Sequence, residues 1–150
     1  MPKVVLDTTV LVSALLNPVE GGASYDLLRQ ADEGSFELIL SDDILEETAQ
    51  VLLTGKRLRK RYRYADEDVV EYCREPARFA AEVLSDVPEI RVVRDPNDDM
   101  ILACAIASDA DVLVSRDKDL LSLGSYEGVA ILTPEDFLGM LRKAGTDRRS

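Results

Sequence analysis

Residues 4–16, VVLDTTVLVSALL, begin with a short β-branched run that ends in an acid at Asp7. The run is apolar at successive positions, which is typical of a strand covered on both faces. The apolar residues from Val10 to Leu16 suit a helix better than a second strand, and Asn17-Pro18 is expected to end that helix. The stretch therefore predicts a strand, an acid and a helix in succession, which is the repeating unit of a parallel α/β sheet.

The same unit recurs along the chain. Further short apolar runs predict strands at 36–40, 90–93, 112–114 and 129–132. Helices are expected at 24–31, 42–54, 66–73, 76–84, 100–107, 119–123 and 134–143, with Ser41 and Thr133 as N-caps. Strands that alternate with helices predict a three-layer α/β/α fold around a central parallel sheet of about five strands. We expect a single domain over residues 1–144 and a disordered tail at 145–150.

Composition narrows the possible chemistry. The chain has 150 residues, with 18 Lys and Arg against 29 Asp and Glu, and its net charge of −11 argues against a protein that coats DNA by neutralising its phosphates. It contains no histidine, which excludes Ser-His-Asp and Cys-His mechanisms and a His-ligated zinc. Acid chemistry must therefore come from carboxylates.

Cysteine usage and hydropathy indicate the compartment. Cys73 and Cys104 are far apart in the sequence and form neither a CxxC metal motif nor a disulfide framework. The longest apolar run, residues 100–107, is too short for the roughly 20 residues of a membrane span. We expect a cytoplasmic protein that does not associate with membranes.

Acidic residues follow each of the first four expected strands, where the ligand sites of parallel α/β sheets lie. They are Asp7, the pair Glu46 and Glu47, the stretch from Asp95 to Asp99, and Asp117 with Asp119. Converging carboxylates raise one another's pKa unless a cation neutralises them. An all-oxygen ligand set favours Mg²⁺ or Mn²⁺. Such ions can activate water and hold the departing oxygen of a phosphodiester, which is the chemistry of metal-dependent nucleases.

Four segments resemble the motifs of PIN-domain ribonucleases, in the family's order and over nearly the whole chain. They are VVLDTTVLVSAL at 4–15, SDDILEET at 41–48, DPNDDMILA at 95–103 and VLVSRDKDLL at 112–121. The family has an Asp after the first strand, a Glu about two turns into a Ser-initiated helix, an Asp three residues before the Ile of an apolar helix, and Ser/Thr-x-Asp-x-Asp-Leu after a strand. The family usually has Asn where this chain has Thr9.

The resemblance assigns roles position by position. It implies that Asp7, Glu47, Asp98 and Asp117 are catalytic metal ligands, with Asp119 as a fifth acid. Thr8 and Ser115 are expected to bind the site or a substrate phosphate. Glu46 is the alternative to Glu47, and Asp95 or Asp99 to Asp98; the number of metal ions, one or two, stays open.

A basic segment, KRLRKRYR at 56–63, carries six positive charges and leaves a charge of −17 on the rest of the chain, since −11 − 6 = −17. Such a run is either a solvated face or a contact surface for phosphates. In the second interpretation Arg57, Arg59, Lys60 and Arg61 bind RNA. Tyr62 and Tyr64 could then stack on unpaired bases.

These features together predict a Mg²⁺- or Mn²⁺-dependent endoribonuclease that hydrolyses phosphodiesters of single-stranded or looped RNA. The resemblance further implies a VapC-like toxin of a toxin–antitoxin pair, with an antitoxin partner and a homodimer. The alternatives are a non-catalytic PIN-like module that binds RNA or protein, and a structure-specific DNA nuclease. A phosphoacceptor receiver-like domain is disfavoured, because only one acid follows the first strand and residues 129–133 hold no lysine.

Overall fold

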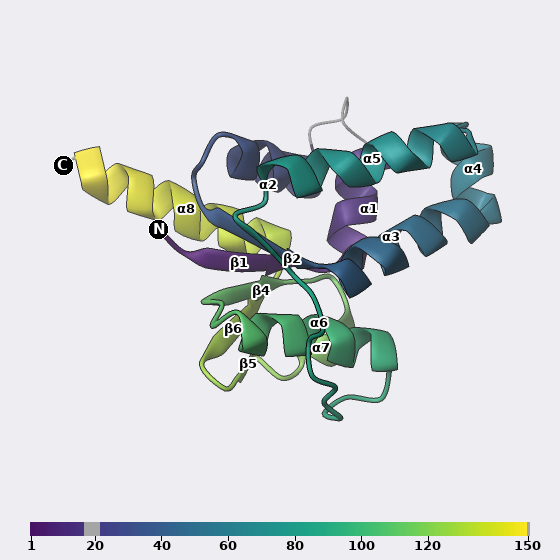
Figure 1. The fold of residues 1–150 in the computed structure, drawn as a ribbon. Coiled ribbons are helices and arrows are strands. Elements are labelled where there is room, and N and C mark those ends of the chain that lie inside the picture. Colours follow the sequence, from purple (N-terminus) through teal and green to yellow (C-terminus); the bar gives the residue numbers. More distant parts are fainter. Residues whose placement is uncertain (17–21, 150) are drawn as a thin grey trace.

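The computed structural model describes residues 1–16 and 22–149; the helix end predicted at Asn17-Pro18 lies outside them. Within these residues a six-stranded, mostly parallel sheet is flanked by helices (Figure 1). The strands are β1 (Lys3–Leu6), β2 (Glu37–Ser41), β3 (Glu82–Leu84), β4 (Val112–Val114), β5 (Ser125–Tyr126) and β6 (Val129–Leu132). The helices are α1 (Thr8–Leu16), α2 (Ala23–Asp32), α3 (Asp42–Thr54), α4 (Lys56–Tyr62), α5 (Asp66–Phe79), α6 (Pro96–Ala107), α7 (Lys118–Leu121) and α8 (Pro134–Arg149).

The strand order, β3-β2-β1-β4-β6-β5, places β1 at the centre of the parallel part of the sheet. Val5 of β1 pairs with Ile39 of β2 on one side and Leu113 of β4 on the other. The chain runs outward from β1 to β2 and β3, and α6 then carries it back to β4 on the other side of β1. Ligand sites of open α/β sheets lie where the direction of winding reverses in this way, beyond the carboxyl ends of the strands. Here that point lies between β1 and β4.

Helices cover both faces of the sheet, which confirms the predicted three-layer architecture. Figure 1 shows α1, α2, α5 and α8 above the sheet and α6 below it. The central strands are correspondingly apolar on both faces, and Val5 and Leu113 are fully buried. Phe36 and Phe137 pack edge to face in the same core, with their ring centroids 5.3 Å apart. In the described part of the chain no helix is both long enough and apolar enough to cross a membrane.

The predicted third strand is wrong in position. Residues 90–93 form a loop, because the backbone N–H groups of Val92 and Val93 donate to the Asp99 carboxylate instead of to a neighbouring strand. The third strand is β3, which pairs with β2 at the edge of the sheet. The sequence predicts a helix from Pro76 through residue 84. Pro76 instead lies inside α5, which ends at Phe79, before β3 begins.

Other boundaries shift by less. α6 begins at Pro96, so the acidic stretch at 95–99 is the N-cap and first turn of a helix and not a separate turn. α8 continues through Gly145 to Arg149, where the sequence predicts a helix end at Lys143. The two-residue strand β5, absent from the predicted sheet, pairs antiparallel with β6. Thr133 caps α8 as predicted, since its hydroxyl accepts the N–H of Asp136.

A sharp corner joins α3 to α4. A Cβ atom at Gly55 would lie 2.7 Å from the carbonyl oxygen of Val51, so only glycine fits there without a shift of the backbone. Below this corner a small second core gathers Val12, Leu52 and Tyr64 between α1, α3 and α5. After this corner, Leu58 and Tyr62 of the basic helix α4 pack against the same small core.

Candidate metal centre

Asp7 lies at the carboxyl end of β1 and is held by hydrogen bonds on both carboxylate oxygens. Its side chain is 1% exposed. One oxygen accepts the backbone N–H of Thr9 at 2.5 Å and the Thr9 hydroxyl at 2.7 Å. The other accepts the Ser115 hydroxyl at 2.5 Å. These bonds fix the orientation of the acid at the point where the winding of the sheet reverses.

Ser115, directly after β4, connects Asp7 to the next acidic segment. Its hydroxyl donates to Asp7 and also accepts the backbone N–H of Asp117 at 2.9 Å. Its own backbone N–H donates to the carbonyl of Leu132, which ties it to β6. The sequence predicts that Ser115 binds the site or a phosphate, and the structure shows it bound to two of the predicted site residues.

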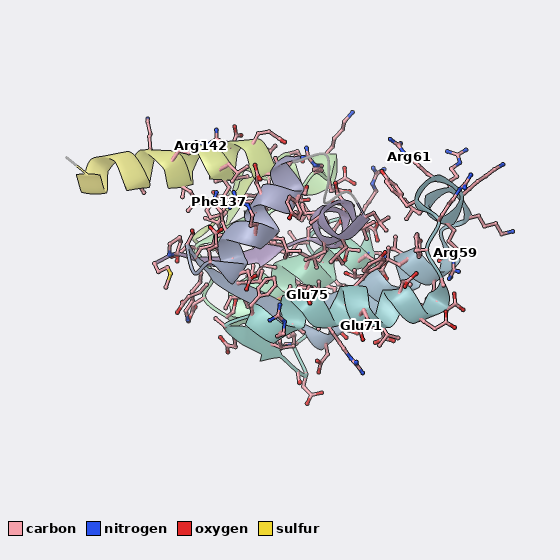
Figure 2. The ribbon with its side chains drawn as sticks, turned by 90° about the horizontal axis from the view of Figure 1, so that it is seen from above. Arg59, Arg61, Glu71, Glu75, Phe137 and Arg142 are labelled. Atoms are coloured by element: carbon pink, nitrogen blue, oxygen red, sulfur yellow. The ribbon has the colours of Figure 1, made fainter. Side chains whose placement is uncertain are left out.

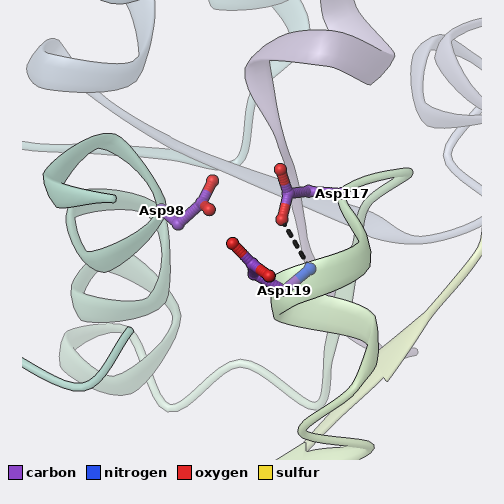
Figure 3. Close-up of side chains that lie close together, drawn as sticks. All are labelled: Asp98, Asp117 and Asp119. Atoms are coloured by element: carbon purple, nitrogen blue, oxygen red, sulfur yellow. Dashed lines mark hydrogen bonds between the residues drawn. The ribbon is translucent and has the colours of Figure 1, made fainter. Parts of the chain in front are cut away.

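Three acids converge beside this pair. Asp98, Asp117 and Asp119 each offer a carboxylate oxygen within 4.8 Å of the others, and we call them the acidic cluster. Figure 3 shows Asp98 on α6 facing the segment of Asp117 and Asp119, where α7 begins. Asp117 caps α7, since one of its oxygens accepts the N–H groups of Asp119 at 2.8 Å and Leu120 at 3.3 Å. The cap leaves the other Asp117 oxygen without a bond to α7.

Asp98 is the buried member of the cluster. It is 6% exposed, and its Oδ2 atom has no hydrogen-bond partner among the described residues. Burial, together with the charges of Asp117, Asp95 and Asp7, raises the pKa of Asp98 to about 7. A buried carboxylate with an unpartnered oxygen and acidic neighbours is favourable only when protonated or neutralised by a cation.

The backbone distinguishes Asp98 from the two acids that the sequence leaves as alternatives. Asp95 is the N-cap of α6 and accepts the N–H of Asn97 at 2.9 Å. Asp99 accepts the N–H groups of Val92 and Val93, both at 2.9 Å, and so holds the loop before α6. Both acids have structural hydrogen bonds, whereas Asp98 faces the cluster. The geometry therefore favours Asp98 as a ligand.

Glu47 approaches the site from α3 but lies outside the acidic cluster. Its carboxylate accepts the side-chain amide of Asn97 at 3.3 Å, one residue from Asp98. Glu46 is exposed, whereas Glu47 is half-buried. The phase of α3 thus favours Glu47 over Glu46. The contribution of Asn97 is not predicted from the sequence, where it reads only as part of a turn.

Positive charge borders the cluster. Arg94, on the loop before α6, lies 3.7 Å from the Asp119 carboxylate and is almost fully exposed. Arg116 makes two hydrogen bonds to Glu135, at 3.0 and 2.8 Å, and these bonds lower the pKa of that glutamate. The motif comparison does not single out either arginine. Their side chains place positive charge at the rim of the site, around the carboxylates of the acidic cluster.

The basic segment is largely the helix α4, at the end of the molecule remote from α8 (Figures 1 and 2). Arg57 and Lys60 are exposed there, as expected for phosphate contacts. Arg59 instead pairs with Asp66. The prediction that Tyr64 stacks on a base is wrong, because it is 7% exposed and its hydroxyl donates to the carbonyl of Leu52 at 2.5 Å.

The residues fit a hard divalent cation. Every acidic side chain at the site offers oxygen, the ligand that Mg²⁺ and Mn²⁺ prefer. The buried, unpartnered Oδ2 atom of Asp98 supplies the independent sign that a cation belongs there. Asp98, Asp117 and Asp119 would hold the ion, with Asp7 fixed behind them through Ser115.

Comparison with known proteins gives a family match and similar folds. A family model described as PIN domain matches residues 3–119. No curated protein sequence matches the chain. Among solved structures, a chain of VapBC2 from Rickettsia felis, crystallised with a DNA fragment from their promoter, superposes with a TM-score of 0.57 at 14% identity, covering 86% of this chain and 96% of that one. The T. brucei RRP44 PIN domain gives a TM-score of 0.50 at 15% identity, covering 97% of this chain and 84% of that one.

Proposed function

This chain belongs to the PIN-domain family, and from that premise we propose that it is a Mg²⁺- or Mn²⁺-dependent endoribonuclease. The acidic cluster carries the proposal, because it joins buried and exposed carboxylates at the winding reversal of the sheet, within 4.8 Å of one another. Among the residues that the structure describes, none forms a hydrogen bond with the Oδ2 atom of Asp98. That arrangement suits a cation and costs stability without one.

Each acid has a distinct role in the proposed reaction, in which water attacks phosphorus and the bond to the leaving oxygen breaks. Asp98, Asp117 and Asp119 would bind the ion, and Asp7, held by Ser115, lies near enough for its charge to raise the pKa of Asp98. Glu47, placed by Asn97, extends the ligand set from α3. When bound, the ion supplies Lewis-acid chemistry, lowering the pKa of water and offsetting charge on the phosphoryl oxygens. The mechanism requires no side-chain nucleophile.

RNA is the proposed substrate. Arg57, Lys60 and Arg61 on α4 present exposed cations, and Arg94 adds one at the rim of the cluster. Local positive charge of this kind lets an acidic protein bind a polyanion. Replacing Arg57, Arg59, Lys60 and Arg61 by Ala should weaken RNA binding and flatten its dependence on salt. An unchanged salt dependence would show that α4 is a solvated face.

The direct test is incubation of the protein with a panel of single-stranded and looped RNAs, with Mg²⁺, with Mn²⁺ and with EDTA, followed by mapping of the cut positions. Asp98→Asn is the matched control, since it keeps the shape of the side chain and removes its charge. Cleavage that needs the metal and is absent in the variant supports the proposal. Cleavage of DNA substrates alone would favour the DNA nuclease, and binding without cleavage the non-catalytic module.

We include in the proposal a toxin role in the cytoplasm, an antitoxin partner and a homodimer. Small stand-alone PIN proteins resemble the toxins of toxin–antitoxin pairs, and a VapBC2 chain has the same fold. Co-expression with the product of an adjacent small open reading frame tests the partner: copurification and loss of RNA cleavage are expected. Light scattering of the purified chain tests the dimer.

A further inference from the structure

A cavity of about 270 Å³ lies between α1, α3 and α4, next to the acidic cluster. Thr8, Thr9 and Val12 line it from α1, and Leu58 and Tyr62 line it from α4. A shallower hollow of about 330 Å³ lies over Asp117 and Asp119, and Thr9 lines that hollow as well. The two spaces are therefore neighbours across a single residue, two positions after Asp7.

We propose that the α1–α4 cavity receives one unpaired nucleobase of the RNA, from a nucleotide that flanks the phosphate bound at the acidic cluster. The inference rests on the proposed ribonuclease function and deepens it, because it adds a site that selects single-stranded RNA. A base held in a stack or a duplex cannot enter a cavity in the protein, whereas an unpaired base can be turned outward.

The walls of the cavity suit a base. Tyr62 provides an aromatic ring, and Val12 and Leu58 provide apolar sides. The volume lies just below the roughly 300–1,000 Å³ of pockets for drug-sized ligands, which favours a single flat ring system. Thr8 is 6% exposed, and its hydroxyl has no hydrogen-bond partner among the described residues. That unpartnered hydroxyl is a polar group in the wall of the cavity, next to the place of the proposed base.

Charge around the cavity suits the rest of the nucleotide. The Arg61 guanidinium lies over the Tyr62 ring, 5.3 Å from its centroid, so a cation covers one face of the ring and the base would stack on the other. Lys56, Arg57 and Lys60 are exposed on the same helix. On the other side of Thr9, Arg116 and Lys118 line the hollow over the acids. An RNA strand that crosses Thr9 would thus have cations for its phosphates on both sides of the inserted base.

The test uses a fluorescent base and does not depend on cleavage. The probe is a single-stranded RNA of about 10 nucleotides that carries 2-aminopurine at each position in turn. It is titrated in Mg²⁺ with the full-length Asp98→Asn protein, while anisotropy of an end label reports binding separately. Stacking on Tyr62 should quench 2-aminopurine at one position of the bound RNA.

Variants locate the quench. Tyr62→Ala should abolish it and weaken binding about 5- to 150-fold, the range for losing one base–aromatic stack. Tyr62→Phe should retain the quench. Ser13 also lines the cavity, so Ser13→Phe, which narrows the cavity and leaves Tyr62 in place, should remove the quench. Tyr126→Ala is the matched control, because that half-buried tyrosine lies on β5 at the far edge of the sheet. Folding of each variant is checked by circular dichroism.

The outcomes separate the two proposals. A quench that Tyr62→Ala removes supports the base site even if the wild-type protein cuts no RNA, in which case only the nuclease function fails. RNA that binds without a position-specific quench, or with a quench that survives both Tyr62→Ala and Ser13→Phe, overturns the base site and leaves the nuclease function intact. Absence of RNA binding overturns both.

Discussion

Asp98→Asn should make the metal-free protein more stable at neutral pH. The wild-type side chain has an ordinary pKa of 3.8 in the unfolded chain and a pKa of about 7 in the fold, so the folded protein keeps a proton that the unfolded chain releases. The stability that this proton provides is fully present below pH 3.8 and is lost as the pH rises to about 7. Asparagine is neutral at every pH, so the variant does not lose this stability as the pH rises.

The size of the stability difference follows from the change in the pKa of Asp98 between the unfolded and the folded chain. At about 1.4 kcal/mol per pH unit, the stability of the variant relative to wild type should rise by roughly 3 kcal/mol between pH 5 and pH 8, with most of the rise complete near pH 7. For a chain of this length that corresponds to about 6–12 °C in Tm. Saturating Mg²⁺ should largely cancel this difference, because an ion at about 100 times its Kd stabilises the wild type by about 2.7 kcal/mol.

The assay is urea unfolding followed by circular dichroism at several pH values, in EDTA and again in Mg²⁺. Asp99→Asn is the matched control: Asp99 is equally buried, but its carboxylate accepts two backbone N–H groups. Weakening these charge-assisted bonds should cost about 1 kcal/mol, with no gain as the pH rises. Parallel stability curves for wild type and Asp98→Asn from pH 5 to pH 8 would refute the electrostatic account of the cluster.

Three other substitutions address the remaining parts of the site and its support. Asp7→Asn should abolish metal-dependent RNA cleavage and leave the circular dichroism spectrum unchanged; full activity would remove Asp7 from the site. Ser115→Ala removes the hydroxyl shared by Asp7 and Asp117, so cleavage should fall and the free energy of unfolding should drop by about 1–3 kcal/mol; unchanged values of both would contradict its bridging role. Tyr64→Phe should cost about 1 kcal/mol in urea unfolding through loss of the bond to Leu52, while RNA binding stays at the wild-type level; weakened binding would mean that Tyr64 does reach the substrate.

The strands could be predicted from the sequence where an apolar run is both buried and hydrogen-bonded to neighbouring strands. β1, β2 and β4 are covered on both faces, and β6 is buried on one face and partly covered on the other, so their apolar runs stand out. β3 is an edge strand of three residues, and Glu82 and Val83 are exposed, so it has no such pattern. Residues 90–93 have the apolar pattern of a strand but do not pair with a neighbouring strand. Ile90 and Val92 pack against the core from a loop. An apolar run thus indicates burial, and only the available hydrogen-bond partners decide whether it is a strand.

The position of the site could also be predicted, because parallel strands bring the acids that follow them to one edge. The choice between neighbouring acids could not. Asp95, Asp98 and Asp99 share one helical turn, and their separation depends on which backbone N–H groups lie nearby. The phase of α3, which exposes Glu46 more than Glu47, likewise depends on how that helix packs. The spacing of residues in the sequence specifies neither the choice among these aspartates nor the phase of α3.

The hydrogen bond between Asp7 and Ser115 joins residues that are 108 positions apart. Ser115 in turn is tied to Leu132 of β6, so this chain of hydrogen bonds is complete only when that strand has joined the sheet. A chain still on the ribosome and made only as far as α5 contains Asp7 and Glu47 but none of the three clustered acids. Proteins are made from the N-terminus at about 5–20 residues per second, so the proposed nuclease stays inactive until β6 has been made. Its mRNA and ribosome are thus exposed to the enzyme only after the last parallel strand has emerged.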